Sequence, residues 1–218
     1  MKSSVSSPKR RGRPGLSREA VIAAAAEIAD REGVGSLTLA ALAAKLGIKP
    51  PSLFNHVDGM ASLRRELAIL ALRELGDALA NSAIGKSRDD AVRALAGEYR
   101  RFARRHPGIY AETLAAADPD DRELNALSNR VLDICLKILS GYGLDRRASL
   151  HAIRAMRSIV HGFSSLEAAH GFGIPMSIDE SFAWLVDTFI AGLNTGVAEK
   201  RHRRDGGATR KKNSLPLA

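Results

Sequence analysis

The stretch TLAALAAKLGIKPPSLFNHV, residues 38–57, constrains the fold more than any other part of the chain. An apolar helix over residues 39–46 is predicted to end at Gly47, and a second short helix follows from Pro51 to His56. Proline fits the first turn of a helix because its missing N–H costs nothing there, and Pro50 before it is placed at the cap. Two short helices joined by a glycine turn predict a helix-turn-helix pair, whose second helix can enter a major groove of DNA.

The packing of this pair also follows from its residues. Ala43 is small where the two helices would cross, and Ile48 and Leu53 are placed to fill the core between them. Thr38 is predicted to be the N-cap of the first helix, with contact to a DNA phosphate as a second role.

Helical patterns continue through the rest of the chain, where Gly and Pro separate the segments and no stretch alternates like a β-strand. We therefore expect an all-α fold of about nine helices. The predicted helices cover residues 17–31, 39–46, 51–56, 60–83, 87–106, 107–116, 121–139, 145–169 and 178–197.

These helices fall into two groups of different character. Residues 17–76 hold short, closely spaced helices and are predicted to form the helix-turn-helix domain, with its motif at 38–57. Residues 77–198 hold five longer amphipathic helices, the expected content of a helical bundle. The boundary is expected between residues 76 and 87.

Positive charge is concentrated at the two ends of the chain. Residues 1–16 carry +5 and residues 199–212 another +5 of a total of +9, so the remaining chain has a net charge of −1. Basic ends on a near-neutral body indicate a polyanionic partner, nucleic acid first and an acidic membrane second. The tail at 199–218 lacks aromatic residues and is predicted to be disordered, at most a non-specific aid to DNA binding.

Several other classes of protein find no support. No apolar run approaches the ~18 residues of a membrane span, and the N-terminus lacks the apolar core of a signal peptide. The one cysteine, Cys135, lies in an apolar helical stretch and is expected in a buried core, which fits a reducing cytoplasm. His151, His161 and His170 do not share a helix face, so no metal is expected. We find no catalytic motif and expect neither an enzyme nor a cofactor.

The first predicted helix and the pattern G…LT…LA…LGI…SL(aromatic)NH, within residues 17–76, resemble the TetR (tetracycline-repressor) family of one-component regulators. The segment IVHGFSSLEAAHGFG, residues 159–173, is similar to a subgroup with a His-Gly signature. The resemblance implies a homodimer that represses transcription from a near-palindromic operator in double-stranded DNA, with half-sites spaced about 34–36 Å or a multiple apart. It also implies that the C-terminal helices hold the dimer interface and a small-molecule pocket. Ligand binding would then move the fourth helix and spread the DNA-binding heads.

The DNA-contact residues implied by the resemblance lie in and around the second helix of the pair: Thr38, Lys49, Pro51, Ser52, Phe54, Asn55 and His56. Asn55 contacts either an adenine edge or only the DNA backbone, and Ser52 and Lys49 reach either base edges or phosphates. His56 is expected to position or touch a phosphate. Phe54 is expected to pack beneath the recognition helix, with its edge near the sugar-phosphate chain.

Three departures from the family pattern affect these contacts. Lys49 stands where the family often has a Ser or Thr cap, and its charge could reach a phosphate instead. Phe54 replaces the usual Tyr, which removes a phenol hydrogen bond to phosphate. The linker HVDGMASL, residues 56–63, lacks a lysine often found before the fourth helix. Fewer backbone contacts in the head place more weight on the N-terminal arm.

That arm contains KRRGRPG, residues 9–15. Its RGRP core is similar to an AT-hook, whose arginines lie along a narrow minor groove of high negative potential. Arg10, Arg11 and Arg13 are therefore predicted to contact the minor groove or phosphates, and the alternative is a solvated tail that binds nothing.

Eight residues of the C-terminal half are candidates to line the ligand pocket, with plain core packing as the alternative: Tyr99, Phe102, Tyr110, Leu114, Leu132, Leu136, Met156 and Val160. His161 and Gly162 are either part of a functional site or structural, and we favour the second: His161 as an interior polar group with a hydrogen-bond partner, and Gly162 as a point of close helix approach. The stretch SFAWLVDTFIAGL around Trp184 has an apolar stripe that suits a dimer interface of the last two helices.

Two other functions remain as alternatives. The basic ends favour a DNA coater of low specificity, whose affinity would fall steeply with salt on every sequence alike. A small-molecule carrier or enzyme that has lost DNA binding would require a degraded recognition helix, and the intact PSLFNH face argues against it. The identity of the effector stays open, since an acidic ligand, an apolar ligand or none at all is compatible with the sequence.

Overall fold

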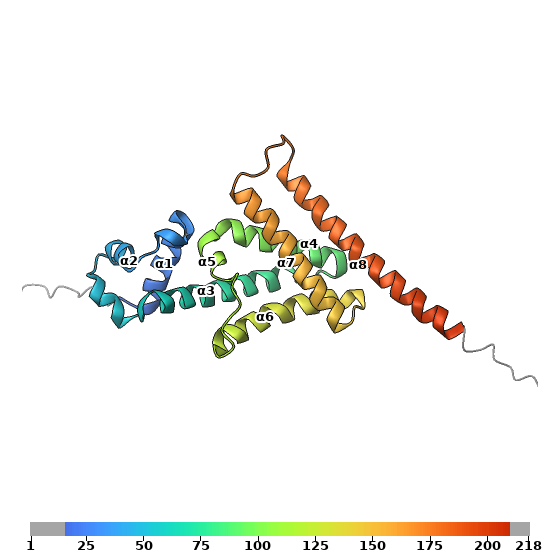
Figure 1. The fold of residues 1–218 in the computed structure, drawn as a ribbon, viewed down its shortest axis with the longest axis horizontal. Coiled ribbons are helices and arrows are strands. Elements are labelled where there is room, and N and C mark those ends of the chain that lie inside the picture. The colour runs from blue at the N-terminus through green and yellow to red at the C-terminus, as the bar shows by residue number, and fades with distance from the viewer. Residues whose placement is uncertain (1–15, 210–218) are drawn as a thin grey trace, which may run out of the picture.

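The computed structural model describes residues 16–209, with side chains up to residue 195 (Figure 1). Its α-helices are α1 (Arg18–Glu32), α2 (Leu39–Leu46), α3 (Gly59–Ser82), α4 (Arg88–Arg105), α5 (Pro107–Ala111), α6 (Arg122–Leu139), α7 (Arg146–Ala168) and α8 (Ile178–Thr209). Three short 3-10 helices, η1 (Val34–Ser36), η2 (Pro50–Asn55) and η3 (Ser140–Tyr142), complete the regular structure of this range, which contains no β-strand. The predicted all-α fold is confirmed.

The helix-turn-helix pair forms as its residues predict. The Thr38 side chain accepts a hydrogen bond from the backbone N–H of Ala41 at 3.0 Å, and α2 begins there. Gly47 ends α2 in the left-handed conformation, with φ at 66°, which glycine adopts without steric cost. Ala43 and Leu53 are both buried where α2 meets the following turn.

The recognition element differs from the prediction in two respects. It is a 3-10 helix, and its cap is Lys49 and not Pro50. Two consecutive prolines supply no N–H, so the first backbone bond in this turn is the i→i+3 bond from Ser52 N to Lys49 O at 2.9 Å. Lys49 precedes the first proline and is therefore held in an extended conformation, with ψ at 142°.

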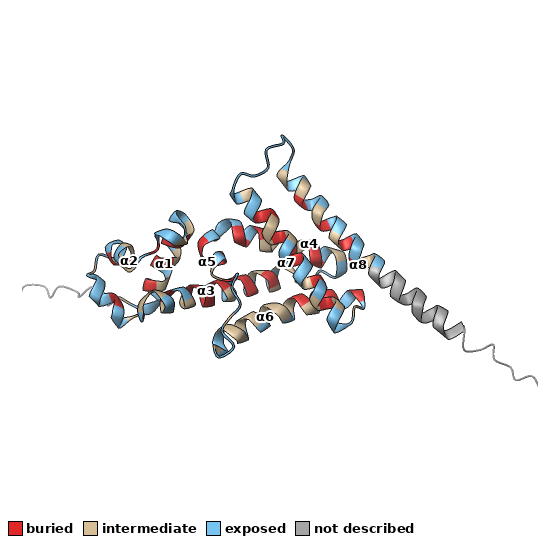
Figure 2. Ribbon diagram, in the orientation of Figure 1, coloured by how far each residue is buried: buried red, intermediate tan, exposed pale blue. Residues whose placement is uncertain are grey.

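Helix α3 connects the two halves of the molecule. In Figure 1 it runs from the blue head, which contains α1 and α2, to the bundle of α4, α6 and α7. Leu63 and Leu67 are fully buried near its N-terminus, and Leu75 and Leu79 are buried near its C-terminus. All four belong to one continuous hydrophobic core, and Figure 2 shows the buried faces of the helices turned inward. The predicted boundary at residues 76–87 falls in the last turns of α3 and the loop after it.

A buried arginine holds α4 against α7 and α8. Arg100 donates two hydrogen bonds to Glu167, at 2.8 and 2.7 Å, and its third nitrogen lies 2.8 Å from Asp179. The guanidinium also lies over the rings of Phe163 and Phe182, 5.3 and 4.7 Å from their centroids. These hydrogen bonds lower the pKa of Glu167, so the pair stays ionised inside the bundle.

Two predicted helix ends are wrong. Helix α5 ends at Ala111 and not near residue 116, where the chain has already turned toward α6. Helix α8 continues to Thr209 and does not end near residue 197, because AEKRHRRD consists of residues that tolerate a helix and the next glycines come only at 206 and 207. The backbone of residues 199–209 thus belongs to α8, while residues 1–15 and 210–218 lie outside the described range. No helix in that range is long and apolar enough to span a membrane.

Candidate functional sites: a DNA-binding surface and an apolar cavity

The first candidate site is the outer surface of η2. Leu53 is fully buried and anchors this turn to the core of the head. The side chains predicted to contact DNA surround that anchor: Lys49, Pro51, Ser52, Phe54 and Asn55 are exposed, and His56 is half-buried. The structure thus brings six of the predicted residues together on one short element.

Phe54 corrects one prediction. Its side chain is 58% exposed, so it does not pack beneath the recognition helix. In a 3-10 helix, residues three apart are eclipsed, so the buried position of Leu53 turns its neighbour Phe54 outward. An exposed aromatic ring beside Asn55 enlarges the surface that can face DNA.

Thr38, the N-cap of α2, is also exposed. Its hydroxyl oxygen already accepts the N–H of Ala41, which confirms the predicted N-cap. The hydroxyl hydrogen remains available to donate to a phosphate. The arginines of the N-terminal arm, Arg10, Arg11 and Arg13, lie outside the described residues.

Ion pairs connect the helices of the head. Lys45 of α2 lies 2.7 Å from Glu27 of α1 and lowers the pKa of that carboxyl. Arg18 of α1 lies 2.9 Å from Glu66 of α3. Each pair connects two helices and has at least one well-exposed member, so its contribution to stability is expected to be small.

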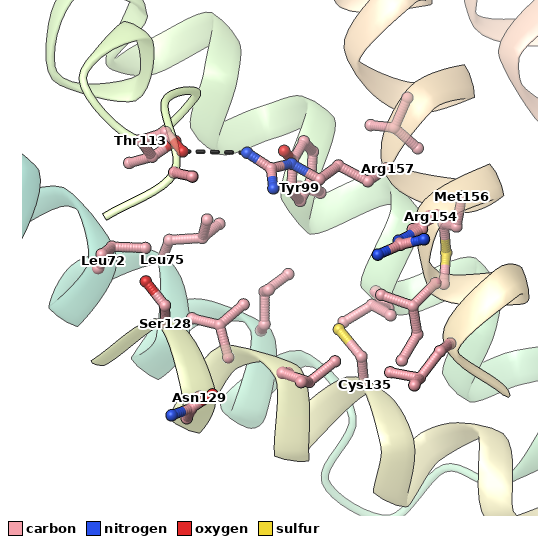
Figure 3. A pocket seen from close by; sticks show the side chains of 18 of the residues that line it. Leu72, Leu75, Tyr99, Thr113, Ser128, Asn129, Cys135, Arg154, Met156 and Arg157 are labelled. Atoms are coloured by element: carbon pink, nitrogen blue, oxygen red, sulfur yellow. Dashed lines mark hydrogen bonds between the residues drawn. The ribbon is translucent and has the colours of Figure 1, made fainter. Parts of the chain in front are cut away.

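The second candidate site is a cavity of about 440 Å³ between α3, α4, α6 and α7 (Figure 3). Four of the residues predicted to line a pocket do line it: Tyr99, Leu132, Met156 and Val160. Leucines of α3 cover the opposite side, among them Leu72 and Leu75. This volume lies within the range of about 300–1,000 Å³ that small-molecule sites occupy.

The other four predicted pocket residues do not line this cavity. Phe102 is buried against the ring of His106, with centroids 5.1 Å apart. Leu114 is 39% exposed. Leu136 is half-buried on α6, next to Cys135, which does line the cavity. Helical spacing alone does not separate these residues from those that line a void.

Tyr110 instead lies behind the cavity wall. Its hydroxyl is 3.3 Å from the hydroxyl of Tyr99 and 2.7 Å from Nδ1 of His161, and burial raises the pKa of this phenol. The interpretation of His161 as a partnered polar group is therefore confirmed. That of Gly162 is wrong, because a Cβ at this glycine would meet no atom within 4 Å in the described chain.

The head and the bundle meet at a tight contact between α1 and α5. Asp30 of α1 accepts the backbone N–H groups of Gly108 and Ile109, at 2.8 and 3.0 Å, and lies 2.9 Å from Nδ1 of His106. A Cβ at Gly108 would lie 2.1 Å from the backbone carbon of Ala29. Only glycine permits this approach, which places α5 directly against the backbone of α1. The sequence carried no signal for this contact beyond the presence of a glycine.

Cys135 is 8% exposed and has no disulfide partner, which confirms its predicted place in the core. Burial raises the pKa of its thiol to about 11, so it stays protonated and unreactive at neutral pH. Within the described residues, no group of three or more His, Cys, Asp or Glu side chains is arranged to hold a metal.

Comparison with known proteins agrees with this geometry. Residues 92–189 match a family described as the tetracyclin repressor-like C-terminal domain. The uncharacterized HTH-type transcriptional regulator YobS of Bacillus subtilis is 38% identical over 183 residues, which are 83% of this chain and 94% of YobS. The chain belongs to the TetR family of transcriptional regulators. As such a regulator it is not an enzyme.

Two further relatives extend the likeness. The class D tetracycline repressor protein of Escherichia coli is 31% identical over 147 residues, 67% of this chain and 64% of the repressor. The TetR family protein ActR of Streptomyces coelicolor, solved in complex with (S)-DNPA, has the same fold, with a TM-score of 0.63 and 16% identity over 84% of this chain and all of ActR.

Proposed function

We propose that this TetR-family regulator is a ligand-responsive repressor that binds a near-palindromic operator as a dimer and is released by a small molecule. The contact of Asp30 with α5 carries this proposal. Helix α5 directly follows α4, which lines the cavity, and Asp30 belongs to α1, the first helix of the DNA-binding head. A fold with a recognition surface and a cavity, coupled by such a contact, can exchange binding energy between two sites.

On DNA, we assign direct base contact to Asn55 and Ser52, the polar residues of η2, in the major groove. Lys49, His56 and the Thr38 hydroxyl would bind phosphates, and Pro51 and Phe54 would contact the sugar-phosphate chain. Arg10, Arg11 and Arg13 would extend the contact into the flanking minor groove.

The dimer would form through α7 and α8, where large apolar side chains are exposed. Trp184 of α8 is 71% exposed and Leu166 of α7 is 52% exposed. Two copies could bury these residues against each other, and a two-fold dimer that binds two half-sites would hold its recognition elements about 34–36 Å, or a multiple of it, apart. Gly162, which follows His161, faces open space in the described chain. We propose that these two residues are the His-Gly signature of the subgroup that residues 159–173 resemble.

The coupling would run from the cavity through α5. A ligand that displaces Tyr99 acts on Tyr110, whose ring packs edge-on against it with centroids 5.7 Å apart. Tyr110 belongs to α5, and Asp30 holds the first turn of that helix. Movement of α5 would then tilt α1 and separate the recognition elements from their grooves.

ActR was solved with a small molecule, and the class D relative is named a tetracycline repressor, which supports ligand-controlled repression here as well. The competing function, a DNA coater of low specificity, rests on the charge of +5 at each end of the chain. The two functions differ in sequence specificity and in salt dependence.

The decisive experiment is selection of bound duplexes from a randomised pool at about 0.2 M salt, where non-specific phosphate binding is suppressed. We expect an enriched inverted repeat. In the Asn55→Ala variant, affinity for this operator should fall about 10- to 100-fold, the usual discrimination of a side chain that contacts a base edge. The control is Asn81→Ala, since Asn81 is an exposed asparagine of α3 far from η2 in sequence. A pool without enrichment, or equal losses for both variants, would favour the coater.

A further inference from the structure

The charge of the cavity lining is one-sided. Two arginines of α7, Arg154 and Arg157, contribute to it, and no Asp, Glu or Lys does. Most of the remaining lining is aliphatic or aromatic, from leucines of α3 and α6 to Tyr99 and Met156. The cavity therefore combines an apolar interior with a positive edge.

The two arginines are placed to act on one group. They are three residues apart on α7 and so lie on the same helix face. In Figure 3 both side chains extend from α7 toward the space between α4 and α6. Both residues line the cavity and are also exposed to solvent, so they lie at its mouth and not in its depth.

Arg157 has donors to spare. One of its terminal nitrogens donates to the carbonyl oxygens of Thr113 and Leu114, at 3.0 and 3.4 Å. A guanidinium has five N–H donors, so most of them remain for another acceptor. An anion at this position would also lie beside the segment that follows α5.

Arg154 has no comparable structural role. Among the described residues Arg154 takes part in no hydrogen bond or ion pair, whereas other arginines, such as Arg18 and Arg130, do. Two neighbouring cations without a carboxylate repel each other, and an anionic ligand removes that repulsion. Arginine is also the side chain best suited to bind carboxylate or phosphate with two parallel hydrogen bonds.

We propose that the effector is an anionic amphiphile, an apolar chain or ring that ends in a carboxylate. Its body fills the cavity between α3 and α6, and Arg154 and Arg157 bind its head at the mouth. This inference rests on the proposed function, in which the cavity is the effector site. It also connects the ligand to the segment after α5, since a head group on Arg157 would share that guanidinium with the Thr113 carbonyl.

The test uses three probes with one chain length and different head groups: decanoate, decanol and decylammonium. Binding to the full-length protein is measured by calorimetry at neutral pH. We expect decanoate to bind about tenfold more tightly than decanol, the lower end for hydrogen bonds to charged groups because both arginines are partly solvated. Decylammonium should bind weakest, and added salt should reduce the preference for decanoate.

Arg154→Gln is the sharper variant, because this side chain holds no part of the fold in place. It should lower the affinity for decanoate about tenfold and leave that for decanol unchanged. Arg157→Gln should lower the affinity for decanoate in the same way. It also removes the hydrogen bonds of Arg157 to the α5–α6 loop, so it alters the local structure as well. Arg147→Gln is the matched control, since Arg147 is an exposed arginine of α7 that does not line the cavity.

Equal affinities for decanoate and decanol, failure of all three probes to bind, or unchanged decanoate binding in both variants would overturn the anionic ligand class. Release of the operator by decanol in those cases would leave the proposed repressor function intact. Conversely, decanoate that binds through Arg154 but does not release the operator would support the ligand class and contradict the proposed regulation.

Discussion

The candidate site of the head and the candidate site of the bundle are built in different ways. In the head, the residues that would contact DNA follow one another along the chain, from Lys49 to His56, and a single buried leucine turns them outward. In the bundle, the cavity is the space that four helices leave between them, and its lining comes from residues 72 to 160. A local motif thus specifies the first site, and only tertiary packing specifies the second.

The two regions also differ in how they are held together. Hydrophobic packing of α1, α2 and η2 around Leu53 and Leu42 holds the head, and each of its ion pairs to Glu27 and Glu66 has at least one well-exposed member. The bundle contains an ion pair that is almost withdrawn from solvent, between Arg100 and Glu167. Mutations should therefore affect the two regions by different mechanisms, and the following changes test this in order of expected effect.

The largest effect is expected at the buried ion pair of the bundle. Arg100→Ala leaves the carboxylate of Glu167 without its main partner, and removal of one member of such a pair costs roughly 3–5 kcal/mol of unfolding free energy. The guanidinium of Arg104, 3.6 Å from Glu167, remains and keeps the loss near the lower end. Urea unfolding measures this loss.

The control is an ion pair at the surface that joins α4 to α8, as the contact of Arg100 with Asp179 also does. Arg93 lies 2.8 Å from Asp187, with both side chains about half exposed. Arg93→Ala should therefore cost less than about 1 kcal/mol. Similar losses for the two variants would mean that the Arg100 pair is no better shielded than a surface pair.

The next effect compares one leucine from each region. Leu53→Ala removes a fully buried side chain of the head and should cost about 2–5 kcal/mol. Leu132→Ala removes a half-buried side chain that already borders empty space, and should cost about 1 kcal/mol, because fewer packing contacts are lost. Chemical denaturation of both variants gives the comparison. An equal cost would show that the cavity closes in solution.

The same contrast explains what the sequence could predict. The cap at Thr38, the turn at Gly47 and the core position of Leu53 depend on neighbours within a few residues, and all three predictions are confirmed. Tyr110 and Tyr99 both carry apolar spacing, but only Tyr99 lines the cavity. Which one does so depends on how α4, α5 and α7 pack, and no local pattern encodes that.

Residues that matter through long-range contacts were missed for the same reason. Arg154 and Arg157 look like ordinary surface arginines until α7 is placed beside the cavity. Asp30 looks like a helix-terminal acid until α5, nearly eighty residues later, presents its N–H groups to it. The 3-10 form of η2 followed from two prolines, a local cause that helix length alone did not reveal.

A third prediction concerns the junction of the two regions. Gly108→Ala places a Cβ against the backbone of Ala29, so α5 must move away from α1, at a cost of about 1–3 kcal/mol. We also expect weaker coupling between ligand and operator, measured as the ratio of operator affinities with and without ligand.

Gly97→Ala in the middle of α4 is the control. Its Cβ would meet nothing within 4 Å, and the substitution should stabilise the folded protein by about 0.5–1 kcal/mol. A stable Gly108→Ala variant with full coupling would rule out this contact as the connection.

The smallest expected effect is a pH dependence of folding stability. It arises where α6 of the bundle contacts the end of α3 nearest the head. Arg65 of α3 donates to both carboxylate oxygens of Asp121, the N-cap of α6, and lowers the pKa of Asp121 to about 2. A carboxyl with a lower pKa in the folded protein than in the unfolded chain stabilises the fold above its ordinary value of 3.8. That contribution should disappear as the pH falls from about 4 toward 2.

We expect Asp121→Asn to retain the cap but lose this part of the acid sensitivity, measured as urea midpoints at pH 5, 4 and 3. Arg65→Gln should produce the same flattening, because it removes the cause of the shift. If both variants keep the wild-type slope, other carboxylates control the acid response, and the contact between α3 and α6 does not depend on this pair.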